Sequence, residues 1–127
     1  MRRWTVDLDG GEPLSANDRE GWQARSERVR TWRRNAQLRA RLVGVPRLAR
    51  ARITLHAVPP VRRKRDPSNL MPTQKAVLDG LVAAGILPDD DPEHVVEDMP
   101  VLHPATENET ARMLKRWRVW VEIEELP

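Results

Sequence analysis

Apolar and polar residues alternate in three stretches of the chain, and each alternation predicts a β-strand with one buried face. The stretches are residues 4–8, 51–58 and 117–123. Every second side chain in them is apolar, which is the period of a strand that packs one face against a core. Residues 95–101 are apolar enough for a fourth, shorter strand. The pattern therefore predicts four strands.

A longer spacing of apolar residues predicts a helical region between the first two strands. In residues 17–43 an apolar side chain recurs at intervals that fit helical turns, so this stretch is expected to form one or two helices. Its apolar side chains should face the core and its arginines should face solvent or DNA. The apolar set is Trp22, Val29, Trp32, Ala36, Leu38 and Leu42, and the arginines are Arg25, Arg28, Arg33, Arg34, Arg39 and Arg41.

Another helix is predicted after the turn-forming sequence of residues 66–69. Asn69 suits its N-cap, Pro72 is tolerated in the first turn, where no amide needs a helical partner, and Gly85 suits the left-handed position past its end. The spacing does not decide between a loop and a short helix for residues 108–115. The side chains expected to face inward from the helix are Leu70, Val77, Leu78, Leu81 and Val82.

Together these elements predict a single α+β domain over residues 1–127, in which a four-stranded mixed sheet packs with two or three helices. A length of 127 residues suits one hydrophobic core. The sequence has no cysteine, which excludes disulfides, thiolate zinc sites and cysteine nucleophiles. No apolar run approaches the roughly 18 residues of a membrane helix, so we expect no membrane partner.

Charge is distributed unevenly, although the net charge is only +3. Residues 1–65 carry 17 Lys and Arg against 6 Asp and Glu, whereas residues 66–127 carry 5 against 13. A basic surface that meets a polyanion and a separate acidic centre would produce this division. Of the 22 cations 19 are arginine, whose planar fork suits phosphate.

Carboxylates occur on both sides of the second predicted helix. Asp66 precedes it, and Asp89, Asp90 and Asp91 follow it. One interpretation is an exposed acidic loop. The other is a divalent-metal site, because the strands that flank the helix could pair and a returning loop could then bring Asp66 near the triplet. Oxygen ligands of this kind suit Mg²⁺.

Two basic features accompany these carboxylates. Lys75 is either the partner of Asp79, four residues later on the helix, or an ammonium directed at a scissile phosphate or a developing oxyanion. The basic run before Asp66 is either a solvated turn or a surface that binds a DNA backbone. Its members are Arg62, Arg63, Lys64 and Arg65.

The aromatic residues are all tryptophan. Trp120 falls on the opposite face of its strand from Trp117, so it packs, stacks on a base or contacts a second copy of the chain. The three histidines lack regular metal-ligand spacing and are interpreted as structural or solvated. The tryptophans expected in the core are Trp4, Trp22, Trp32 and Trp117.

Residues 65–90, RDPSNLMPTQKAVLDGLVAAGILPDD, resemble the RusA family of Holliday junction resolvases. The shared features are an RDxDN-like turn, a helix with a KxxxDxLxxAG core, and an Asp pair. Residues 13–19, PLSANDR, are similar to the opening of that family. The strong resemblance covers about 26 residues, and the order of elements agrees loosely across most of the chain.

The resemblance implies a RusA-like homodimer that binds four-way DNA junctions and cuts two opposed strands with Mg²⁺, for which Mn²⁺ can substitute. By position, Asp66 and Asp90 match family aspartates, Asp89 is the neighbour of Asp90, and Lys75 matches the family lysine about three residues further along. The implied catalytic residues are Asp66, Asp90 and Lys75, and the location is the cytoplasm of a bacterial or phage-infected cell. The implied DNA contacts are Arg62, Arg63, Lys64, Arg65, Arg33 and Arg34.

One departure from the family concerns the metal ligands, which we predict to be Asp66, Asp89, Asp90 and Ser68. Ser68 stands where the family has a second aspartate, so one anionic ligand is missing. We expect reduced cleavage. The leading hypothesis is thus a Mg²⁺-dependent, structure-selective endodeoxyribonuclease that resolves four-way junctions in recombination and repair. The alternative is a non-catalytic junction-binding protein with a weakened metal site.

Overall fold

The computed structural model describes residues 1–16, 19–105, 113 and 115–127. Its helices are α1 (Trp22–Val43), the 3-10 helix η1 (Pro67–Leu70) and α2 (Met71–Ala83). Its strands are β1 (Arg3–Leu8), β2 (Ala51–Val58), β3 (Val95–Glu97), β4 (Val101–Leu102) and β5 (Arg118–Glu125).

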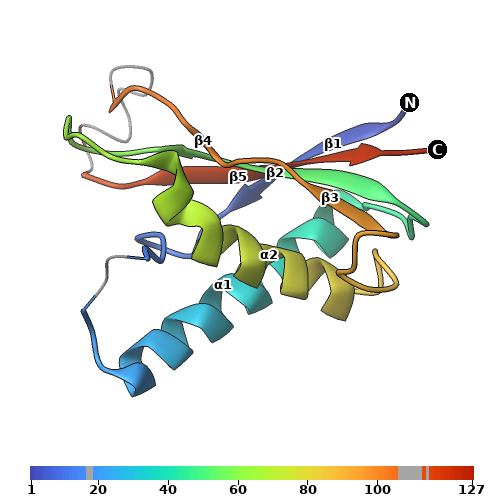
Figure 1. Ribbon diagram of the computed structural model, residues 1–127, viewed down its shortest axis with the longest axis horizontal. Coiled ribbons are helices and arrows are strands. Elements are labelled where there is room, and N and C mark those ends of the chain that lie inside the picture. Colours follow the sequence, from blue (N-terminus) through green and yellow to red (C-terminus); the bar gives the residue numbers. More distant parts are fainter. Residues whose placement is uncertain (17–18, 106–112, 114) are drawn as a thin grey trace.

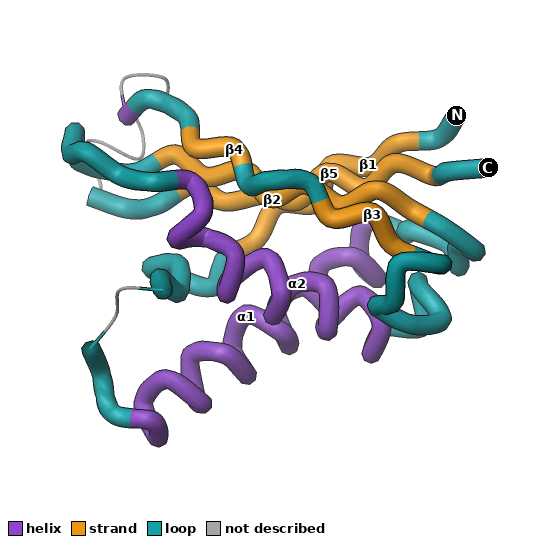
Figure 2. The backbone as a smooth tube through the Cα atoms, in the orientation of Figure 1, coloured by secondary structure: helices purple, strands orange, loops and turns teal. Residues whose placement is uncertain are grey.

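The strands form one mixed sheet, and both α-helices cover the same face of it (Figures 1 and 2). Its order is β1-β5-β2-β3, and β4 also pairs with β2. β5 is antiparallel to both β1 and β2, whereas β3 and β4 run parallel to β2. The α+β class with a mixed sheet is therefore confirmed. The predicted strand at residues 95–101 is divided into β3 and β4, which gives five strands.

The core lies between the sheet and the helices. Alternate residues of β2 and β5, such as Ile53 and Val121, are fully buried there, as the period-two pattern predicts. The other face of these strands carries Thr54, His56 and Trp120. No described helix covers that second face (Figure 2).

Helices α1 and α2 cross at a close approach that depends on glycine. A Cβ added to Gly80 would lie 2.3 Å from the main-chain oxygen of Arg33 and 3.0 Å from Cβ of Ala36. Only a residue without a side chain lets the two backbones come so near. Gly10 likewise permits a close approach, in this case of the main chain to the ring of Trp32. A Cβ added to Gly10 would lie 2.5 Å from that ring.

The first helical region is a single helix whose buried stripe is narrower than expected. Trp32 and Ala36 are fully buried, together with Ala40. Trp22 and Leu42 were expected in the core but are 77% and 80% exposed, and Leu38 is also exposed. The buried positions follow a spacing of four, so small alanines form the contact with α2 and the large side chains at the helix ends remain in solvent.

The start of the second helical region also differs from expectation. Asp66, not Asn69, is the N-cap, because its side chain accepts a hydrogen bond from the main-chain N–H of Ser68. Asn69 lies inside η1. Pro72 in the first turn of α2 and Gly85 with φ +78° are both as predicted. Of the undecided stretch at residues 108–115, all but residues 113 and 115 lie outside the described part of the chain.

Candidate functional site

Lys75 of α2 and Asp90 of the following loop are in direct contact. The ammonium Nζ of Lys75 contacts Oδ2 of Asp90 and lies 3.1 Å from Oδ1 of Asp79. The main-chain N–H of Asp90 donates to Oδ1 of Asp89 at 2.7 Å. All of these side chains reach solvent. Two residues assigned to catalysis by the resemblance are thus brought together although 15 positions separate them.

This contact changes the proton affinities of both groups in opposite directions. The hydrogen bond from Lys75 holds the pKa of Asp90 below its ordinary value, with a further contribution from Asp89. The carboxylate of Asp90 in turn raises the pKa of Lys75, and Asp79 adds to that effect. Lys75 is therefore a fixed ammonium, and Asp90 remains an anion in mildly acidic solution.

Asp66 occupies a separate turn with its own partner. One carboxylate oxygen, Oδ1, accepts from both the main-chain N–H and the hydroxyl of Ser68, at 2.9 and 2.8 Å. These two bonds lower the pKa of Asp66. Ser68 occupies the position at which the resemblance places a second aspartate. Its hydroxyl is neutral and orients Asp66 by donating a hydrogen bond to it.

The topology explains why no described contact joins Asp66 to Asp89 or Asp90. The strands on either side of the helix do pair, as expected, but they pair in parallel, with Val95 beside Ala51. The loop before β3 therefore lies near the start of β2, whereas Asp66 follows its end. The eight residues of β2 span about 23 Å at about 3.3 Å per residue. Figure 1 accordingly shows the loops before and after α2 at opposite ends of that helix.

The donor chemistry at the Asp89–Asp90 pair suits Mg²⁺, although the set of protein ligands is small. No group of three His, Cys, Asp or Glu residues among those described is arranged to hold a metal ion. Mg²⁺ needs fewer, since it usually binds through one or two carboxylates, several waters and substrate phosphates. The exposed carboxylates of Asp89 and Asp90 fit that requirement, and the neighbouring ammonium of Lys75 would share the charge of Asp90.

The basic residues expected to contact DNA differ in how far their side chains are exposed to solvent. Arg62, Arg63 and Lys64 are exposed in the loop that joins β2 to η1, and Arg33 and Arg34 are exposed on α1. Arg65 is half-buried, with its guanidinium 4.8 Å from the ring centre of Trp117.

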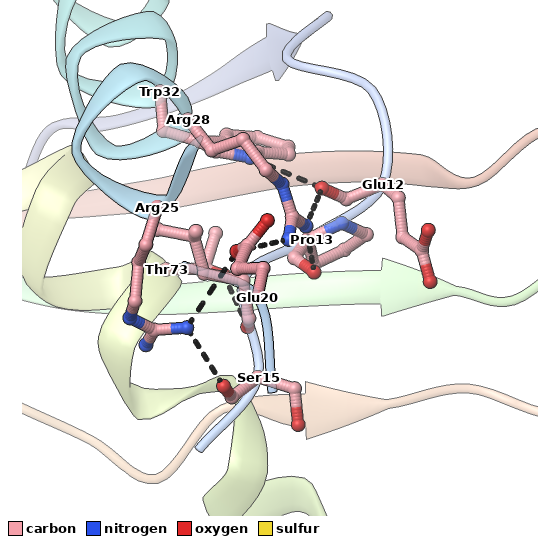
Figure 3. A network of polar contacts seen from close by, with 9 residues as sticks. Glu12, Pro13, Ser15, Glu20, Arg25, Arg28, Trp32 and Thr73 are labelled. Carbon is pink, nitrogen blue, oxygen red and sulfur yellow. Dashed lines mark hydrogen bonds and ion pairs between the residues drawn. The ribbon is translucent and has the colours of Figure 1, made fainter. Parts of the chain in front are cut away.

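Two arginines of α1 are engaged with the N-terminal loop and not directed to solvent (Figure 3). Arg28 donates to the main-chain oxygens of Glu12 and Pro13, both at 2.9 Å, and lies 2.6 Å from the carboxylate of Glu20. Arg25 donates to the main-chain oxygen of Ser15 at 3.1 Å. The described residues Glu12, Pro13 and Ser15 are therefore fixed against α1.

One cluster was missed by the sequence interpretation because it is assembled from β2, β5 and the residue that follows β4. His56 Nδ1 and His103 Nε2 are 2.9 Å apart, and both rings stack with Trp120 at centroid distances of 5.1 Å. The guanidinium of Arg118 lies 4.6 Å from the ring centre of Trp120, and Glu122 lies 3.5 Å from His56 Nε2. The alternation did place His56 and Trp120 outside the core face, but their register could not be read from the sequence.

Neither a scan of protein-family models nor a search of curated proteins finds a match to this chain. Among the described residues, no helix combines the length and apolar character needed to cross a membrane. The resemblance to the RusA family accordingly rests on residues 65–90 and on the order of elements.

Proposed function

We propose that this protein binds branched DNA and cleaves it in a metal-dependent reaction, as a structure-selective endonuclease of the RusA type. The observation that carries the proposal is the contact between Lys75 and Asp90. An exposed ammonium–carboxylate pair, with a second carboxylate at Asp89, is suited to phosphodiester chemistry on an exposed surface.

Each group has a distinct role in the proposed reaction. Asp89 and Asp90 would hold Mg²⁺ or Mn²⁺, which when bound supplies Lewis acidity at the scissile phosphate. Lys75, kept protonated by Asp90, binds a non-bridging phosphate oxygen and stabilises the negative charge that grows there. Asp66, oriented by Ser68, lies next to the basic loop of residues 62–65 and would assist from the other side of the DNA contact.

A nucleic-acid substrate is favoured by the exposed cations beside Asp66. Arg62, Arg63 and Lys64 lie just before Asp66, and Arg33 and Arg34 are further exposed cations on α1. Contacts to phosphates carry no base information, so selection of a junction would come from shape. A homodimer would present two such surfaces to a two-fold symmetric junction, and this second part of the proposal follows from the family resemblance.

The test compares a labelled four-way junction with a linear duplex of the same sequence, in Mg²⁺, Mn²⁺ or EDTA. We expect nicked junction products only with metal. Asp90→Asn and Lys75→Met should each lower the cleavage rate by roughly a hundredfold, the scale of one charge-stabilising group. Glu93→Gln removes an exposed carboxylate from the same loop and should cleave like the wild type. Equal products from all four proteins would refute the assigned site.

A second candidate, junction binding without cleavage, is favoured by a specific observation. Lys75 already neutralises Asp90, and Ser68 supplies a hydroxyl where the family has a carboxylate. Both features reduce the negative charge available to a cation. This candidate predicts a retained gel shift of the junction in EDTA and intact DNA after prolonged incubation with Mn²⁺.

A further inference from the structure

A basic hollow of about 440 Å³ opens beside the loop that follows β2. We call it the Arg65 pocket and define it by Arg63, Arg65, Lys115, Arg116 and Trp117. It lies between the end of β1, the loop before η1 and the segment that enters β5. Its volume is within the range of small-ligand sites.

The cations of the Arg65 pocket outnumber the carboxylates that line it. Within the described part of the chain, none of its four basic side chains forms an ion pair. Two carboxylates, Asp9 and Glu12, also line the hollow, and Asp9 lies 3.7 Å from Arg39 on α1. Four positive charges therefore face two negative ones, and the hollow keeps a positive potential.

A second hollow of similar size lies on the sheet face that no described helix covers, and its arginines, unlike those of the Arg65 pocket, are paired with carboxylates. It measures about 490 Å³ and contains Arg3 and Arg52. Arg3 is paired with Glu124 at 3.3 Å and Arg52 with Asp98 at 3.4 Å. The protein satisfies the cations of that hollow internally, so it offers an anion much less than the Arg65 pocket does.

Arg65 provides the strongest indication of a missing acceptor. Its Nε is buried and has no hydrogen-bond partner among the described residues, while the guanidinium rests on Trp117. Buried donors are nearly always paired, so an acceptor from outside the chain is expected. A guanidinium fixed on an aromatic ring presents its fork in one orientation, which suits two oxygens of one phosphate.

We infer that the Arg65 pocket binds one phosphate of a nucleic-acid strand. A strand is favoured over a free anion because the exposed Arg62 and Lys64 continue the basic surface away from the hollow. The inference rests on the proposed function and extends it, because Lys115, Arg116 and Trp117 lie outside the residues assigned to DNA from the sequence. It places a phosphate contact directly beside Asp66.

The binding test uses fluorescence anisotropy of a labelled four-way junction in EDTA at several NaCl concentrations. Lys115→Gln and Arg116→Gln change exposed side chains and should not affect folding. Each should weaken binding roughly three- to tenfold and reduce the slope of log K against log salt by about 1. Arg47→Gln, an exposed arginine elsewhere, is the matched control and should bind like the wild type. Unchanged affinity and slope in both pocket variants would overturn the inference.

The source of the phosphate is tested by NMR of the arginine Nε–H groups. The Arg65 resonance is identified as the one absent from Arg65→Lys. It should shift on addition of the junction and remain in place with inorganic phosphate or dTMP at the same phosphate concentration. A shift with the free anions but not with DNA would refute the nucleic-acid part of the inference.

Cleavage assays with the same variants separate this inference from the proposed function. If the wild type cleaves DNA in Mg²⁺ and the pocket variants bind normally, the inference alone fails. If no protein cleaves DNA but the pocket variants lose affinity, the nuclease proposal fails and the phosphate pocket stands.

Discussion

The side chain of Gln74 completes the hydrogen bonding of β2 at Leu55, where the neighbouring strand is interrupted. Oε1 of Gln74 accepts from the main-chain N–H of Leu55 at 2.9 Å, and its Nε2 donates to the main-chain oxygen of Asp98 at 2.8 Å. β3 pairs with β2 as far as Ile53, and β4 begins opposite His56. A fully buried amide of α2 thus fills the gap in the ladder and positions the following residue, Lys75.

Replacement of Gln74 by Met should destabilise the fold substantially. The variant keeps the volume but leaves the buried Leu55 N–H and the half-buried Asp98 carbonyl unpaired. Each unpaired group costs about 1–3 kcal/mol, so the free energy of unfolding should fall by about 2–6 kcal/mol. Urea denaturation measures it. Gln37→Met is the control, because Gln37 makes only a 3.5 Å bond at a half-buried position. Equal losses in the two variants would contradict the role of Gln74.

Gly80→Ala should separate the two helices. The new Cβ would meet the main-chain oxygen of Arg33 at 2.3 Å, and backbone cannot move aside as a flexible side chain does. Overpacking of this kind costs about 1–3 kcal/mol, which thermal unfolding would detect. Gly21→Ser adds a Cβ in open space at the N-cap of α1, where serine is favoured, and should be neutral or stabilising. A neutral Gly80→Ala would show that the helices can shift without loss.

Stability should depend on pH through His56. Burial lowers the pKa of His56 below its ordinary value of about 6.5, with His103 acting in the same direction and Glu122 opposing it. The unfolded chain therefore takes up a proton before the folded one does. The stability that neutral His56 contributes is fully present above about pH 6.5. It is lost as the pH falls from there through the pKa of His56 in the folded protein.

The measurement is the thermal midpoint of unfolding between pH 7.5 and 5, for the wild type and for His56→Gln. Glu122, His103 and Arg118 surround the stacked rings and are unchanged in the variant. The wild type should lose more stability on acidification than the variant does. Parallel curves for the two proteins would show that His56 does not carry the effect.

Ser68→Asp should convert the Asp66 turn into a stronger cation site. The substitution removes the hydroxyl that donates to Asp66 and adds a like charge, so the pKa of Asp66 should rise from its lowered value. Binding of Mn²⁺, followed by calorimetry, should tighten. Ser68→Ala loses the donor without adding a carboxylate and should bind Mn²⁺ no better than the wild type. Identical Mn²⁺ affinity in the Asp and Ala variants would contradict this account.

The strands and their buried faces could be predicted because they depend on near neighbours in the chain. The alternation in β2 and β5 identified Ile53 and Val121 as core residues. The same reasoning failed for Trp22 and Leu42, since helical spacing identifies a stripe but not how much of it the partner helix covers. Ala36 and Gly80 set that contact, and a small residue carries little hydrophobic signal.

The candidate site was predictable in composition but not in arrangement. The sequence determined which groups are available: an acidic triplet after a helix, a lysine within it, and a basic run before it. The tertiary structure decided that Lys75 contacts Asp90, that Asp66 stays with Ser68, and that Arg65 meets Trp117. The physical reason is that a parallel crossover fixes which ends of a helix and its strands meet, and no local pattern in a chain encodes that choice.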